Sequence, residues 1–164
     1  MTCELKGLYE FELFNEDGSF CRSWTCQNGV TTPGVNDLLT VAFAVGTQKT
    51  SWFIGLINNN SFSTLSSADT MASHSGWTEL TDYTESTRQT WSPGTASGGS
   101  ISNTSVASFT INANSAINGA FMASSSGKLA TTGILYSTGS FATVQNLIAG
   151  QVLRVTYTIT LVPN

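Results

Sequence analysis

Hydrophobic and polar residues alternate near the start of the chain. Within residues 8–14, aromatic and aliphatic side chains occupy the odd positions from 9 to 13, and glutamates occupy the positions between them. A period of two is typical of a strand with one buried face. A turn at residues 15–18 contains a glycine, and the chain can return over residues 19–26 as a second strand. The pattern predicts an N-terminal hairpin within residues 1–30.

A helical pattern follows the predicted hairpin. The apolar positions share the i, i+3, i+4 and i+7 spacing of one helix face: Val35, Leu38, Leu39 and Ala42. Thr32 is suited to the N-cap, and Pro33 is suited to the first helical position. We expect a short amphipathic helix over residues 33–45 that lies against a sheet.

The remainder of the chain carries mainly strand signals. Residues 51–57 are apolar on both parities, which is typical of a strand that is buried on both faces. The clearest alternation lies at residues 153–161, where aliphatic residues and Tyr157 face one way and mostly threonines the other. Shorter strands are expected at residues 107–112, 116–124 and 131–137.

Several short strands joined by turns rich in glycine, asparagine and serine are typical of an antiparallel β-sandwich or a jelly roll. We therefore predict a mainly β fold of this kind with one short amphipathic helix. A chain of 164 residues matches one ordinary domain, so a single domain is expected over residues 1–164. The hairpin and the helix would precede a sandwich body at residues 51–162.

Charged residues are scarce and unevenly distributed. They make up 10% of the chain, compared with roughly 25% in typical soluble proteins. Residues 89–164 carry only Lys128 and Arg154. A long uncharged surface suits contact with another protein, because an unpaired charge is costly to bury. The six basic residues are scattered and the net charge is −4, which argues against a nucleic-acid partner.

The sequence contains no stretch suited to a membrane. Its most apolar run, residues 52–57, is far shorter than the roughly 20 residues that span a bilayer. The three cysteines, Cys3, Cys21 and Cys26, cannot all pair with one another, and free thiols are favoured. A bridge between Cys21 and Cys26 stays open on spacing alone. With one histidine beside these cysteines, an ordinary zinc site is not expected.

Candidate catalytic groups are few. His74 is the single histidine, and no Gly-x-Ser-x-Gly motif supplies a nucleophile for it, so a structural or capping role is favoured. The densest acidic group, which is spaced by ten, three and three residues, fits neither a glycosidase pair nor a calcium loop: Asp69, Glu79, Asp82 and Glu85. Helix capping by Asp69 and pairing of one of the other acids with Arg88 are favoured. We predict no enzyme, no cofactor and no metal site.

The aromatic residues of the central region have two interpretations. Trp77, Tyr83 and Trp91 would form a stacking platform for sugars if they were exposed. Core packing is favoured, because most large aromatic side chains of so small a domain are needed to fill its interior.

The central segment also carries a family resemblance. WFIGLI at 52–57 is followed by ADTMASHSGWTEL at 68–80, then by Tyr83 and by Arg88 with Trp91 three residues later; GVNDLL at 34–39 precedes them. In this order the segments resemble a family of small structural proteins of tailed bacteriophages, and the resemblance spans roughly residues 28–162. Six positions are identified as family-typical structural positions without known functional roles: Asp69, His74, Gly76, Trp77, Arg88 and Trp91.

The resemblance implies a virion protein similar to the cement, or decoration, proteins that bind the outer capsid surface and stabilise the head. Its partner would be the major capsid protein, and it would self-associate as a homodimer or homotrimer. It would be made in the cytoplasm of the host bacterium and located on the capsid surface. The alternative is a receptor- or glycan-binding domain of a tail or head fibre, with an exposed aromatic trough between Trp77 and Trp91.

Overall fold

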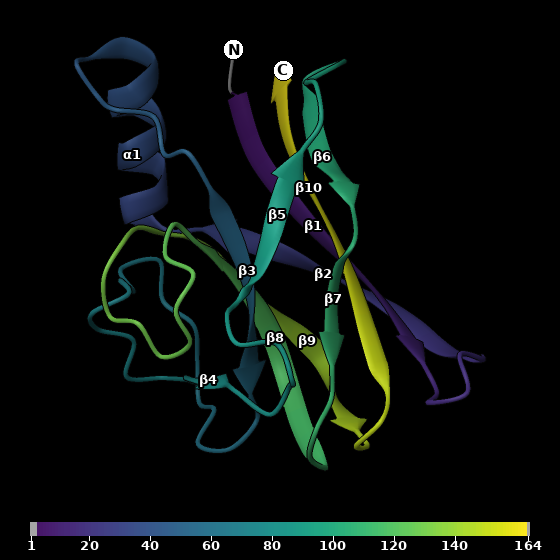
Figure 1. Cartoon of the computed structure of the whole chain (residues 1–164). Coiled ribbons are helices and arrows are strands. Elements are labelled where there is room, and N and C mark those ends of the chain that lie inside the picture. Colours follow the sequence, from purple (N-terminus) through teal and green to yellow (C-terminus); the bar gives the residue numbers. More distant parts are fainter. Residues whose placement is uncertain (1–2, 164) are drawn as a thin grey trace.

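The computed structural model describes residues 3–163 and shows a β-rich chain with one short helix (Figure 1). The helix α1 spans Thr32–Phe43. The strands are β1 (Cys3–Phe14), β2 (Phe20–Val30), β3 (Trp52–Asn58), β4 (Thr78–Leu80), β5 (Gln89–Pro93), β6 (Ser100–Ser105), β7 (Ala107–Thr110), β8 (Ser115–Ala123), β9 (Leu135–Leu147) and β10 (Val152–Pro163).

Eight of the strands close into an antiparallel barrel. Their order around the barrel is β1-β2-β9-β8-β3-β5-β6-β10, and β10 pairs again with β1. The two outer strands, β4 and β7, pair with β3 and β10. A mainly β fold with one short helix is therefore confirmed, whereas the predicted sandwich or jelly roll is wrong. The barrel closes because β1 and β10, at opposite ends of the chain, pair along their whole length, from Cys3–Pro163 to Phe14–Val152.

The barrel interior holds the main hydrophobic core. The hydrophobic side chains that alternate along β1 and β10 point into the barrel, as the sequence predicted, and form the centre of this core. None of them is more than 1% exposed: Tyr9, Phe11, Leu13, Leu153, Val155 and Tyr157. The rings of Tyr9 and Tyr157 stack with their centroids 4.0 Å apart. A cross-strand aromatic pair of this kind fixes the register of two strands as well as burying area.

A second hydrophobic cluster lies on the outer side of β3, β8 and β9. Ile57, Phe121 and Leu135 point away from the interior, and the long β3–β4 connection covers them with Met71 and Trp77. Because β3 is covered on both faces here, its sequence does not alternate between apolar and polar residues. The prediction that residues 51–57 are buried on both sides is confirmed for the stretch from residue 54 to residue 57.

The N-terminal hairpin consists of β1 and β2, and its turn contains Gly18 with a φ of +81°. On its other edge β2 pairs with β9 through only two residue pairs, Gly29–Thr138 and Val30–Ser137. Farther along, the side chain of Arg22 crosses from β2 to β9 and donates to the side chain of Gln145. The β2–β9 seam is therefore weakly paired, as is the β5–β6 junction, which also has two residue pairs.

Helix α1 is attached mainly at its N-terminal end. The N-cap is Thr31, one residue before the predicted Thr32, because its side-chain oxygen accepts the amide of Gly34. Gly34 is the buried residue of the helix, and a side chain there would collide with the backbone of Tyr136. The expectation that the helix lies along a sheet is wrong for its second half, which extends beyond the barrel wall (Figure 1). Within residues 3–163 no helix has the length and apolar character needed to cross a bilayer.

Candidate functional site

Five of the six family-typical positions gather on the outer side of the barrel, around the second hydrophobic cluster. Asp69, His74, Gly76 and Trp77 lie in the β3–β4 connection, and Arg88 lies directly before β5. The sixth position, Trp91, belongs to the main core inside the barrel.

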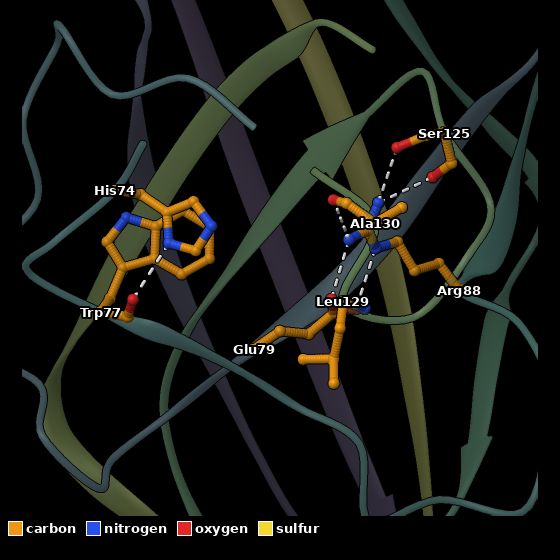
Figure 2. A network of polar contacts seen from close by, with 7 residues as sticks. All are labelled: His74, Trp77, Glu79, Arg88, Ser125, Leu129 and Ala130. Atoms are coloured by element: carbon orange, nitrogen blue, oxygen red, sulfur yellow. Dashed lines mark hydrogen bonds and ion pairs between the residues drawn. The ribbon is translucent and has the colours of Figure 1, made fainter. Parts of the chain in front are cut away.

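An ion pair between Arg88 and Glu79 forms the polar centre of this region (Figure 2). Arg88 Nε and Nη2 donate to the two carboxylate oxygens of Glu79, both at 2.8 Å. The remaining guanidinium hydrogens reach the carbonyl and hydroxyl of Ser125 and the carbonyl of Ala130. The Glu79 carboxylate also accepts the amide of Leu129 at 2.7 Å. Of the three acids predicted as partners of Arg88, Glu79 is the one that pairs with it.

Trp77 is anchored beside this ion pair. Its indole nitrogen donates to the Asp69 carboxylate at 3.0 Å, and the same carboxylate oxygen accepts the amide of Ser66. Asp69 thus closes a loop around Trp77 and does not cap a helix as expected. The ring of His74 stacks on the indole of Trp77 with ring centroids 3.9 Å apart (Figure 2). Nδ1 of His74 lies 3.0 Å from the backbone carbonyl oxygen of Trp77. Gly76 leaves room for the carbonyl of Thr64, which a side chain there would strike.

These contacts make the region a structural clamp. The guanidinium of Arg88, the carboxylate of Asp69 and Nδ1 of His74 are each engaged by neighbouring protein groups. Within residues 3–163, no three histidine, cysteine or acidic side chains gather to hold a metal ion. Cys21 and Cys26 are free thiols; five residues apart on one strand, they point to opposite faces. The side chain of Cys3 lies outside the described part of the structure.

The central aromatic residues are buried. Trp77, Tyr83 and Trp91 have exposed fractions of 2%, 1% and 4%. The favoured interpretation of core packing is therefore confirmed. A sugar-stacking trough cannot form from these three side chains as they stand.

The apolar surface that sequence reasoning missed lies on α1 and the turn after it. Leu39, Phe43 and Val45, which we term the helical ridge, are exposed, and Phe43 is 85% exposed. Large exposed hydrophobic groups clustered in this way are typical of protein–protein contact sites. Leu39 belongs to the face that was expected to be buried; Phe43 and Val45, apolar residues outside that face, were the available signal. Asp37 of α1 and Lys49, which follows the helix, pair at 3.0 Å and cancel each other's charge.

No known protein family matches the chain, and no curated protein is similar to it in sequence. The resemblance to tailed-phage structural proteins therefore stays a prediction. What the geometry defines is a rigid barrel with one clamped outer side and one exposed apolar ridge.

Proposed function

We propose that the chain is a structural protein of a bacteriophage particle, one that binds the outer capsid surface as a cement or decoration protein and stabilises the head. The observation that supports this proposal is the helical ridge. Four of the ten large hydrophobic residues exposed within residues 3–163 lie between Leu38 and Val45. A monomeric protein gains nothing from displaying them in water, whereas an attached protein buries them.

The attachment follows from the shape of the ridge. Phe43 projects from the last turn of α1 and would fill a pocket on the major capsid protein, as buried aromatic anchors do at interfaces. Residues 38–48 carry no charged side chain, so this surface can approach without burying an unpaired charge. The capsid repeats each contact many times, and a dimer or trimer that engages two sites would gain avidity by roughly 10²–10⁴. Self-association is thus part of the proposal, with a location on the capsid surface.

The alternative, a glycan-binding domain of a fibre, has less support. It requires exposed aromatic rings, and the three that were expected to provide them are at most 4% exposed. Binding of the isolated protein to a glycan array would favour this alternative and would count against the cement role.

The test is co-sedimentation of the protein with expanded empty capsids of the parent phage. We expect the wild type to co-sediment and Phe43→Lys to remain in the supernatant. The matched control is Ile148→Lys, which changes another exposed apolar residue, 59% exposed, in the β9–β10 turn, at the other end of the barrel from α1 (Figure 1). Absence of the wild type from the capsid pellet would overturn the proposal. Equal loss in both variants would overturn the role of the ridge.

A further inference from the structure

A cleft of about 430 Å³ opens at the end of the barrel where α1, the start of β1 and the end of β10 lie (Figure 1). Its most buried lining residues are Trp91, Met122 and Tyr136, all less than 7% exposed. Trp52, Ile101 and Ile159 line it further, and Trp52 meets Tyr136 edge to face with ring centroids 5.5 Å apart. These six residues are aromatic, aliphatic or methionine, and all of them lie on strands.

The protein leaves this apolar space open. Leu38 and Val41 line it from α1, yet the helix is held to the barrel mainly near Gly34, and Leu38 remains 40% exposed. The indole of Trp91 is fixed by a hydrogen bond of 2.9 Å to the carbonyl of Tyr157, so it cannot swing to fill the cleft without losing that bond. A preformed concave site of 300–1,000 Å³ in the mouth of a β-barrel is the usual setting for a small-molecule ligand.

Two polar features indicate what kind of molecule fits. Tyr136 lines the cleft, and its hydroxyl makes no hydrogen bond to another group within residues 3–163. A hydroxyl that the protein itself does not engage favours a ligand that can hydrogen-bond to it in place of water. At the rim, the Asp37–Lys49 pair has no net charge, so it offers a charged ligand no compensation for its lost hydration.

We infer that this cleft binds a small, neutral, mainly apolar molecule that carries one hydroxyl or carbonyl group. Its volume is about three times the ~150 Å³ that accommodates benzene, which corresponds to a ligand of two or three fused rings or of similar bulk. The helical ridge faces away from the cleft, since Leu39 and Phe43 do not line it. The inference is therefore independent of attachment to a capsid and is tested on the isolated protein.

The test uses 1-naphthol, naphthalene and 1-naphthoate as probes in calorimetric titrations, with the indole N–H resonances of Trp52 and Trp91 followed by NMR. We expect 1-naphthol to bind with a stoichiometry of one and to shift both resonances. Naphthalene should bind about three- to tenfold more weakly, because it cannot hydrogen-bond to Tyr136. The naphthoate anion should bind more weakly than naphthol, since its charge must leave water without a partner.

Three variants locate the site. Tyr136→Phe should abolish the difference between naphthol and naphthalene while it keeps the ring. Leu38→Glu, on the cleft wall, should weaken naphthol binding by at least about tenfold, and the neighbouring Leu39→Glu should leave it unchanged. Absence of naphthol binding at millimolar concentration would overturn the inference, as would equal effects of Leu38→Glu and Leu39→Glu. Loss of capsid attachment in Leu38→Glu without naphthol binding to the wild type would instead assign the cleft to the capsid interface.

Discussion

Glu79 and Arg88 form a bidentate ion pair, and their side chains are only 3% and 1% exposed. The pair holds together parts of the chain that otherwise share little contact. Glu79 belongs to β4, Arg88 precedes β5, and the remaining hydrogen bonds of Arg88 reach the β8–β9 connection at Ser125 and Ala130. The guanidinium also lies 5.1 Å from the centre of the Phe121 ring. Every N–H of Arg88 is thus used in fixing loops against the barrel.

Arg88→Met should be among the most destabilising single changes in the protein. It leaves the buried carboxylate of Glu79 without its counter-ion, which typically costs about 3–5 kcal/mol. Urea denaturation would measure the loss as a lower free energy of unfolding. The control is Lys6→Met, which removes an exposed ion pair with Glu4 and should change stability by less than about 1 kcal/mol. A loss in Arg88→Met no greater than in the control would show that the clamp is not structural.

Asp69→Ala should destabilise the β3–β4 connection through Trp77. The indole N–H would remain buried without an acceptor, at a cost of about 1–3 kcal/mol. Asp69→Asn keeps an oxygen at that place and should recover most of the loss. Thermal unfolding followed by near-ultraviolet circular dichroism reports on the packing of the aromatic side chains, Trp77 among them. Equal stability of the alanine and asparagine variants would contradict a role for this hydrogen bond.

The sequence predicted most strands where hydrophobic residues alternate, and it failed where tertiary pairing decides. Strand β10 was evident because its buried parity is continuous. Strand β6 was missed because its sequence, SISNTS, contains one apolar residue, and neighbouring strands on both sides hold it in the barrel. Strand β9 continues ten residues past the predicted end at 137. Its second half was missed because it is polar, and pairing with β8 holds it in the sheet.

Barrel and sandwich were not distinguishable from local patterns. Both alternate inward and outward residues, and the difference lies in whether β1 meets β10, which is a contact between the two ends of the chain. The clamp was predicted in part: a pairing of Arg88 with one of three acids was expected, and burial selects Glu79. The helical ridge was not foreseen, because the spacing of apolar residues defines the faces of a helix but not which of them the barrel covers.

All four tyrosines should resist ionisation until the protein unfolds. Burial raises the pKa of Tyr136 to about 12 and the pKa values of Tyr9, Tyr83 and Tyr157 above their ordinary value near 10. Above pH 10 the unfolded chain therefore binds fewer protons than the folded protein, so the free energy of unfolding falls as pH rises. The stabilisation is complete below pH 10 and is lost as the pH passes through the folded-state values.

The measurement is a spectrophotometric titration of tyrosinate, run in parallel with far-ultraviolet circular dichroism. We expect the tyrosinate signal to appear together with loss of the β-sheet signal, whereas the chain in guanidinium chloride should titrate near pH 10. A tyrosine that ionises near pH 10 while the fold persists would contradict its burial in the barrel.

Gly139→Cys should form a disulfide with the native Cys26 and close the β2–β9 seam. A Cβ added to Gly139 would lie 3.1 Å from the sulfur of Cys26, about the separation between a Cβ and the far sulfur in an unstrained disulfide. The bridge would join residues more than a hundred positions apart, beside a junction with only two backbone residue pairs. Constraining so long a loop in the unfolded chain should raise the free energy of unfolding by about 2–4 kcal/mol.

Burial raises the pKa of Cys26 to about 12, so little thiolate is present in the folded protein. The bond should therefore form during refolding with oxidised glutathione rather than afterwards in air. Peptide mapping identifies the bridge, and Gly139→Ser, which adds a side chain of similar size without a bond, separates the disulfide from crowding against Asn28. If mapping finds Cys26 free in the refolded variant, or if reduction leaves its stability unchanged, then β2 and β9 are not as close at this point as the fold requires.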